Sequence, residues 1–309
     1  MKRILWLLFI SLFIIGACSQ DDSNGEPATS DEETEDQQGD EEPSETDEDE
    51  GTDEEEPAVD TTEVDVNELL VVSYGFSDND EFLRYELMPV EGELTEEERL
   101  LETLRLSDPT VSQSFQYLES VTIEAGTATL QFEVSDPFLS LASTEHLLLD
   151  QMLHQVARHY QIEQYVLMEG ETRGLDYGQV GFVEEIDVEL EPYAGVFLMT
   201  DQALIDDVEM PVFRMISGFV ETEDNQSFDE AVMFSADQVA PTGYASILNG
   251  MTLQDVSVSN EEAVLTVEGQ AEDEAAFHEG LALMAMVYDL AAVTIEYPDQ
   301  MAETKLMIK

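Results

Sequence analysis

Hydrophobic and polar residues alternate over Val121–Val134, and this period of two predicts two β-strands joined by a tight turn at Ala125-Gly126. One face of such a hairpin packs while the other faces water. Apolar residues at helical spacing follow over Thr144–Tyr160, and a short strand is predicted at Gln164–Met168. The pattern therefore predicts a unit of strand, turn, strand, helix and strand.

The same pattern returns between Leu253 and Asp299. Leu118–Ile123 aligns with Leu253–Val258 at a constant offset. The apolar positions of the two predicted helices also align: Leu149, Leu153, Val156 and Tyr160 with Phe277, Leu281, Met284 and Tyr288. We interpret the repeat as a tandem duplication, which predicts two folded domains.

Segments upstream of the two units agree with this interpretation. The tripeptide Met88-Pro89-Val90 recurs as Met210-Pro211-Val212. Each tripeptide is followed by a capping box, the signal of a helix N-terminus: Thr95 with Glu98, and Ser227 with Glu230. A helix is therefore expected ahead of each hairpin.

These elements predict an α+β fold of two tandem small domains, at residues 69–190 and 191–309. Each domain is expected to hold a mixed or antiparallel sheet of about three to five strands with two helices packed on one face. In the first domain, strands at Leu69–Tyr74 and Phe82–Met88 and a helix at Thr95–Leu106 precede the hairpin, and Val180–Val188 adds a late strand. The elements predicted for the second domain are Ala194–Met199, Val208–Ile216, Phe228–Ser235, Val256–Val267, Ala275–Asp289, Val293–Tyr297 and Thr304–Ile308.

The first 17 residues are typical of a signal peptide, with Lys2 and Arg3 ahead of the apolar run Ile4–Ile15. This run is too short to span a bilayer as a permanent helix, which needs about 20 residues. Ile15-Gly16-Ala17-Cys18 fits a lipobox, so we expect cleavage before Cys18 and a thioether between its thiol and diacylglycerol. Acyl chains such as palmitate would anchor the protein stably on the extracytoplasmic face of the cell membrane. A secretory signal with a chance cysteine is the alternative.

Residues 18–68 are predicted to be a disordered acidic linker. About half of Ser19–Glu68 is Asp or Glu, with no Lys or Arg, so the segment cannot bury enough apolar surface to offset the entropy of ordering. A flexible coil of this length spans about 40 Å, and like-charge repulsion extends it further.

The formal net charge of the whole chain is −62. A surface this acidic repels phosphates, so the composition excludes nucleic acid as a partner. Salt screens such self-repulsion, so a halophilic or alkaliphilic host is one interpretation, and ordinary acidic solvation of the surface is the preferred one. Cys18 is the single cysteine, so no internal disulfide can form.

The sequence shows no pattern of catalytic or metal-binding residues. The histidines His146, His154, His159 and His278 lack metal-ligand spacing, and we expect them at the surface or at the boundary of the core. No nucleophile elbow, Walker loop or dinucleotide-binding motif is present. We therefore predict a protein that is not an enzyme, with no cofactor and no metal. The glycine-rich stretch Gly170–Gly181 is expected to link two strands as an exposed contact loop.

The hairpin stretch Leu118–Phe132, followed by Asp136–Leu139, resembles the signature of the GerMN domain family. The helix Leu147–Tyr160 and the strand Tyr165–Gly170 resemble the family's long helix and following strand. The resemblance implies a domain similar to the ring-building motif of secretion assemblies. It implies a lipoprotein that acts in sporulation or germination, and no catalytic residues.

Together these features predict a membrane-anchored, non-catalytic lipoprotein of a Gram-positive, spore-forming bacterium. Its domains would pack with envelope or sporulation-complex proteins, including further copies of itself. Two alternatives stay open. A ligand-binding or sensor lipoprotein predicts a closed pocket between the copies, and a cell-wall enzyme predicts titratable groups that converge in a cleft.

Overall fold

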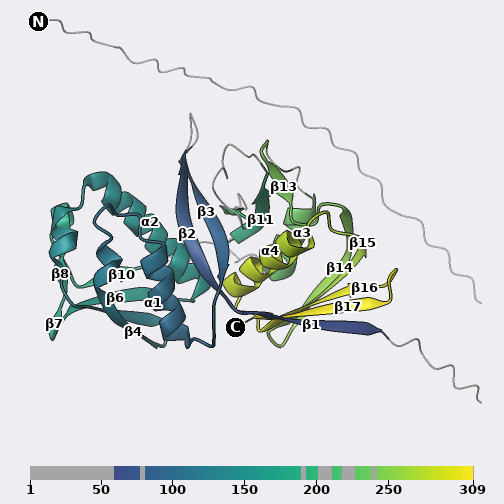
Figure 1. The fold of residues 1–309 in the computed structure, drawn as a ribbon, viewed down its shortest axis with the longest axis horizontal. Coiled ribbons are helices and arrows are strands. Elements are labelled where there is room, and N and C mark those ends of the chain that lie inside the picture. Colours follow the sequence, from purple (N-terminus) through teal and green to yellow (C-terminus); the bar gives the residue numbers. More distant parts are fainter. Residues whose placement is uncertain are drawn as a thin grey trace, which may run out of the picture. The chain divides into compact units, whose positions relative to one another are not determined.

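The computed structural model describes residues 59–76, 81–188, 193–200, 211–217, 227–237, 240 and 242–308. The signal peptide, Cys18, the linker up to residue 58, the predicted turn Ser77–Asp80 and the boundary near residues 190–192 lie outside these described residues. The described chain has an α+β fold, as predicted, and divides into two modules of the same element order (Figure 1).

The first module contains two strands, a helix, a hairpin, a second helix and two further strands. These elements are β2 (Glu68–Phe76), β3 (Glu81–Pro89), α1 (Glu96–Leu106), β4 (Leu118–Glu124), β5 (Thr127–Phe132), α2 (Ser143–His159), β6 (Gln164–Glu169) and β10 (Glu185–Asp187). Short elements lie between them: the 3₁₀ turns η1 (Ser114–Tyr117), η2 (Asp136–Ser140) and η3 (Gly178–Val180), and the strands β7 (Thr172–Arg173), β8 (Leu175–Asp176) and β9 (Phe182–Val183).

The second module repeats this order and adds one short strand, β13 (Tyr244–Ser246). Its main elements are β11 (Tyr193–Met199), β12 (Phe213–Ser217), α3 (Phe228–Asp237), β14 (Met251–Ser259), β15 (Glu262–Gly269), α4 (Glu274–Val287), β16 (Ala292–Tyr297) and β17 (Ala302–Ile308). The predicted second strand, Val208–Ile216, is thus described only as β12, because residues 201–210 lie outside the described ranges.

Backbone register shows that the two modules are copies of one unit. Strand order is β10-β6-β5-β4 in the first module, and β17-β16-β15-β14 occupies the same places in the second. Both hairpins are antiparallel and carry a bulge at the same position, between Leu118 and Ser120 and between Leu253 and Asp255. In both modules the second hairpin strand then pairs in parallel with the strand that follows the long helix. A right-handed crossover through that helix is the expected connection for such a pair.

The predicted turns and caps are also present in both copies. The hairpin turns at Ala125-Gly126 and Asn260-Glu261 have positive φ at both central residues, as a tight two-residue turn requires. The α1 capping box between Thr95 and Glu98 is complete. At the start of α3 the Ser227 N–H donates to Glu230 Oε2 at 3.0 Å. The Asp273 carboxylate is the N-cap of α4 and accepts from the Ala276 N–H at 3.0 Å.

The first strand pair of each module does not stay within its own module. Instead, β2-β3 and β11-β12 join into one sheet of order β13-β11-β12-β3-β2. Equivalent strands β3 and β12 run antiparallel side by side, with Tyr85 opposite Phe213. This arrangement relates the two modules by an approximate two-fold axis. The separate sheets expected from the sequence are therefore linked by a third, shared sheet.

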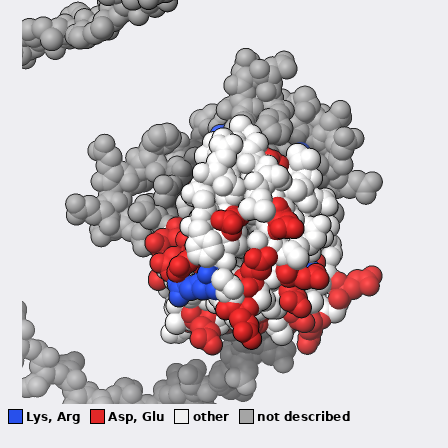
Figure 2. All heavy atoms as spheres, turned by 90° about the vertical axis from the view of Figure 1, so that its left-hand side faces the viewer, with Lys and Arg blue, Asp and Glu red and all other residues white. Residues whose placement is uncertain are grey.

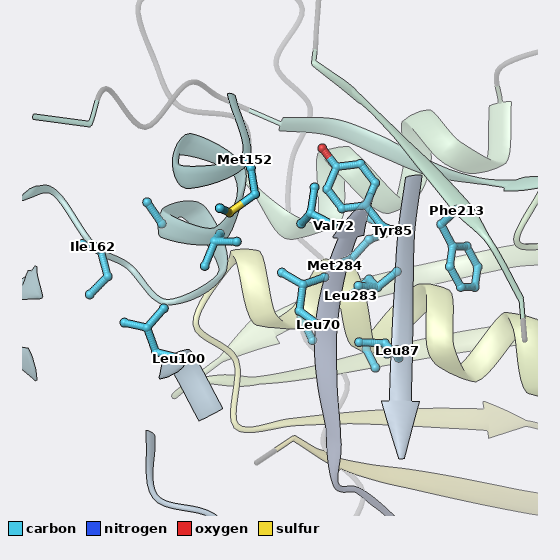
Figure 3. Close-up of a cluster of buried hydrophobic side chains, with 14 of the residues drawn as sticks. Leu70, Val72, Tyr85, Leu87, Leu100, Met152, Ile162, Phe213, Leu283 and Met284 are labelled. Atoms are coloured by element: carbon cyan, nitrogen blue, oxygen red, sulfur yellow. The ribbon is translucent and has the colours of Figure 1, made fainter. Parts of the chain in front are cut away.

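One hydrophobic core runs through both modules at this shared sheet. Figure 3 shows side chains of β2 and β3, among them Leu70, Val72 and Leu87, between the first module's helices and α4 of the second module, which contributes Leu283 and Met284. All of these side chains are almost fully buried. The two modules therefore share one continuous core.

Strand β1 (Asp60–Val66) falls inside the predicted linker range 18–68, so the linker ends earlier than expected. It pairs in parallel with β17, the last strand of the chain, along its whole length. Only Val66 is buried, at 7% exposed, so β1 is held chiefly by backbone hydrogen bonds. The hydrophobic pattern of the sequence did not predict β1, because most side chains of this strand are acidic or polar and face water.

The β1–β17 ladder predicts different effects of proline at two adjacent threonines. The Asp60 N–H donates to Met301 O at 3.1 Å, and alternate residues of a strand face the same neighbour, so Thr62 N–H points to β17 and Thr61 N–H points away. Thr62→Pro should therefore lower the free energy of unfolding by about 1 kcal/mol or more. Thr61→Pro, at an equally exposed side chain, should have a much smaller effect. Urea denaturation of both variants provides the measurement, and equal losses would contradict the pairing.

Candidate interaction surface and inter-module cavity

The predicted lipidation site, Cys18, lies outside the described residues. Within the described residues, no cluster of His, Cys, Asp and Glu has the geometry of a metal site. No helix in that part of the chain combines the length and apolar character of a bilayer span. Candidate function must therefore be sought in surfaces and cavities.

The histidines are only partly where the sequence predicted them. His146, His154 and His278 are half-buried, as expected for boundary positions. His159 is 8% exposed, so the expectation of a surface or boundary position is wrong for this residue. It lies in the last turn of α2, 6.3 Å from the Tyr85 ring across the shared sheet. Burial, together with the neighbouring Arg158 charge, lowers its pKa to about 3, so the imidazole is neutral.

The two modules differ most between their last two strands. In the second module residues 298–301 connect β16 to β17, whereas residues 170–184 connect β6 to β10 in the first. This insertion contains β7, which pairs with β6, and a small antiparallel pair of β8 with β9. It includes the glycine-rich Gly170–Gly181 stretch, which connects strands as predicted.

Aromatic packing fixes the insertion to the body of the module. Tyr177 stacks on Phe138 with ring centroids 5.5 Å apart, and its ring lies 4.9 Å from that of His146 on α2. Leu175 is fully buried. At the tip, Ser143 Oγ donates to Gln179 Oε1 at 3.0 Å. The insertion is therefore a packed part of the fold rather than a loose loop.

Five large apolar side chains around the N-terminal end of α2 are between 52% and 92% exposed. We call this set the apolar rim: Val111, Leu139, Leu147, Val180 and Phe182. Figure 2 shows that side of the molecule, where few charged side chains lie in the upper part and Asp and Glu crowd the lower part. In a chain with 72 Asp and Glu, a region of exposed apolar residues points to an interaction surface.

Local contacts hold the rim in place. The Val111 N–H donates to Glu145 Oε1 at 2.9 Å, which ties the loop before η1 to the start of α2. The Phe182 ring lies over Gly174, where a Cβ atom would come within 2.4 Å of the ring. Arg173 forms an ion pair with Glu185 and lies 3.7 Å from Glu184, next to the strand that presents Phe182. These contacts fix the positions of Val111 and Phe182 in the rim.

A second feature is a cavity of about 570 Å³ between the modules. It lies where the N-terminus of α1, the C-terminal ends of α2 and α4 and the β14–β15 turn meet. Apolar and aromatic side chains, including Leu70, Tyr160 and Met286, line it together with a set of carboxylates: Glu68, Glu93, Glu96, Glu261 and Asp289. Four of these carboxylates, all except Glu68, are exposed to solvent, so the cavity is open and not the closed pocket that the ligand-binding alternative predicted.

Carboxylates are crowded near this cavity. Partial burial raises the pKa of Glu96, and the neighbouring Glu97 and Asp289 charges raise it further. Burial also raises the pKa of Glu68. Arg99, whose guanidinium donates to the Glu68 backbone oxygen and to Asn67 Oδ1, supplies one positive charge against these five lining carboxylates. The cavity therefore carries a concentrated negative potential.

The insertion predicts a position-specific cost of adding a methyl group. Gly178 and Gly170 both have left-handed backbone conformations, with φ of 53° and 57°. A Cβ at Gly178 would lie 2.6 Å from His146 Nε2, whereas a Cβ at Gly170 would meet nothing within 4 Å. Gly178→Ala should therefore cost about 1–3 kcal/mol more than Gly170→Ala. Thermal unfolding of both variants measures the difference, and equal costs would mean that the insertion is not packed as described.

A carboxyl group between the modules predicts a dependence of stability on pH. Burial, together with the charges of Glu68 on β2 and of Asp273, raises the pKa of Glu279 on α4 from 4.5 to about 7. The folded protein then keeps a proton that the unfolded chain releases, so stability falls as pH rises from 4.5 to 7.

Glu279→Gln should remove this loss. Because the side chain is only half-buried, we expect a gain of about 1 kcal/mol at pH 8 relative to the wild type and none at pH 4. Urea denaturation at both values measures it, with Glu124→Gln, an exposed residue of β4, as the control. A gain that is the same at both pH values would rule out titration of Glu279 as its cause.

Comparisons with known proteins find a similarity in structure. No family model matches the sequence, and no curated protein matches it. Among solved structures, the chain is similar to the tandem GerMN domains of the sporulation protein GerM from Bacillus subtilis, with 10% sequence identity and a TM-score of 0.42. The similarity covers 78% of this chain and 97% of that chain.

Proposed function

We propose that this chain is a non-catalytic lipoprotein that binds envelope proteins through its first module. The apolar rim is the observation that carries the proposal. Its residues belong partly to the insertion, which the second module lacks, so the duplication has left one copy as scaffold and given the other a binding surface.

Charge favours a particular partner chemistry. The chain has 72 Asp and Glu against 10 Lys and Arg, so two copies repel each other at moderate salt. A partner with basic residues around an apolar centre gains long-range attraction to the acidic surface and then buries the rim. We therefore favour a basic envelope protein over a second copy of this chain.

The predicted N-terminal features supply location and reach. Lipidated Cys18 would hold the protein at the outer face of the cell membrane, and the acidic linker would let the modules search about 40 Å around the anchor. Holding the modules near the membrane raises their effective concentration for a membrane partner. The sporulation or germination setting rests on the resemblance of Leu118–Leu139 to the GerMN family.

A photo-crosslinking residue at Phe182 of the full-length protein, in its own host, tests the proposal. We expect one or a few discrete adducts with envelope proteins during sporulation. The matched control is the same residue at Val258, an exposed apolar position on β14 of the second module. Specific adducts should be absent at Val258. The adducts at Phe182 should disappear when Val180→Asp is added. The same adducts from both positions, or generic wall components only, would contradict the assembly role.

A separate experiment tests the predicted lipid anchor at Cys18. Cys18→Ala should move the protein from the membrane fraction to the soluble fraction and remove incorporated palmitate. Retention in the membrane fraction would show that the lipobox interpretation is wrong while leaving the binding surface intact.

A further inference from the structure

The cavity between the modules is separate from the apolar rim and has a different chemistry. Its volume of about 570 Å³ is enough for a small organic molecule or a long side chain. Its walls come from both copies, since Glu96 and Tyr160 belong to the first module and Met286 and Asp289 to the second. The cavity therefore exists only while the modules are packed together.

The distribution of side chains around the cavity is amphipathic. Leu70 and Leu290 are buried, while Tyr160 and Met286 are half-buried, so the inner wall is apolar. Glu93, Glu96, Glu261 and Asp289 are exposed and form an acidic mouth. This combination suits an aliphatic body that carries a positive charge.

His159 adds an observation independent of the carboxylates. It lines the cavity, is 8% exposed, and neither of its ring nitrogens has a hydrogen-bond partner among the described residues. A buried polar group without a partner costs free energy unless something satisfies it. The neutral ring adds no positive charge that would repel a cation.

We infer that this cavity binds an aliphatic primary ammonium group, supplied either by a free diamine or by a lysine side chain. The apolar wall would contact the methylene chain, and the acidic mouth would pair with the ammonium. A metal ion fits less well, because the described residues contain no group of carboxylates or histidines with metal-binding geometry. The cation Arg99 lines the cavity too, but its single positive charge is outnumbered by the four carboxylates of the mouth.

Calorimetric titration of the full-length protein in a neutral detergent, at pH 8 and 150 mM salt, tests this inference. The probes are 1,5-diaminopentane, N-acetyl-lysine methylamide and 1-pentanol, which is the uncharged control. We expect saturable one-to-one binding of at least one amine, with the better of the two identifying the source of the ammonium, and no detectable binding of pentanol. Equal binding of pentanol, heats that do not saturate, or displacement of the amine by one equivalent of Ca²⁺ would overturn the assignment.

Variants locate the binding and separate it from general attraction to an acidic protein. Glu96→Gln with Asp289→Asn should weaken amine binding about fivefold or more, and asparagine is tolerated at the positive φ of Asp289. The control removes the same charge elsewhere, as Glu119→Gln with Glu124→Gln on the exposed side of β4. Circular dichroism verifies that both double variants are folded. Equal weakening by the two pairs would overturn the site, whereas loss confined to the cavity pair supports it, whatever the crosslinking at Phe182 shows.

Discussion

The pairing of β3 with β12 is the contact on which the rest of the described structure depends. It places β3 and β12, equivalent strands of the two copies, side by side. The strand edge that each copy would otherwise expose is therefore paired with the other copy. Buried apolar residues then continue from one module into the other. Since each Å² of apolar surface removed from water is worth about 25 cal/mol, separating the modules would be costly. The inter-module cavity and the path of β1 from one module to the other follow from this union.

Local patterns in the sequence predicted what is local in the structure. The hairpins, long helices, capping box at Thr95 and N-cap at Asp273 depend on residues a few positions apart, and the duplication allowed each copy to support the other. The shared sheet depends instead on the pairing of β3 with β12, in which Tyr85 lies opposite Phe213. The hydrophobic pattern of the sequence does not predict this long-range pairing. The burial of His159 likewise involves a residue far away in the sequence, Tyr85 of β3. The apolar rim could have been suspected from Val180 and Phe182 in the unequal connection, but exposure is known only from the fold.

Acidic charge has two different consequences in this molecule. Over most of the surface it provides solvation and repels like-charged molecules. Between α1 and α4 it is concentrated against an apolar wall, where partial burial raises the pKa of Glu68 and of Glu96. The apolar rim shows the opposite composition on the first module. One unit, duplicated and then modified, thus presents two surfaces that favour different partners.

The pairing of β1 with β17 also has a consequence for the order of folding. The earliest described segment completes its hydrogen bonds only with the last strand of the chain, a sequence separation of more than 200 residues. Contacts of such separation form slowly, because a large loop must close before they are made. If the predicted signal peptide directs export of the extended chain, the sheet of the second module can form only after β17 has crossed the membrane, so export would limit the last step of folding.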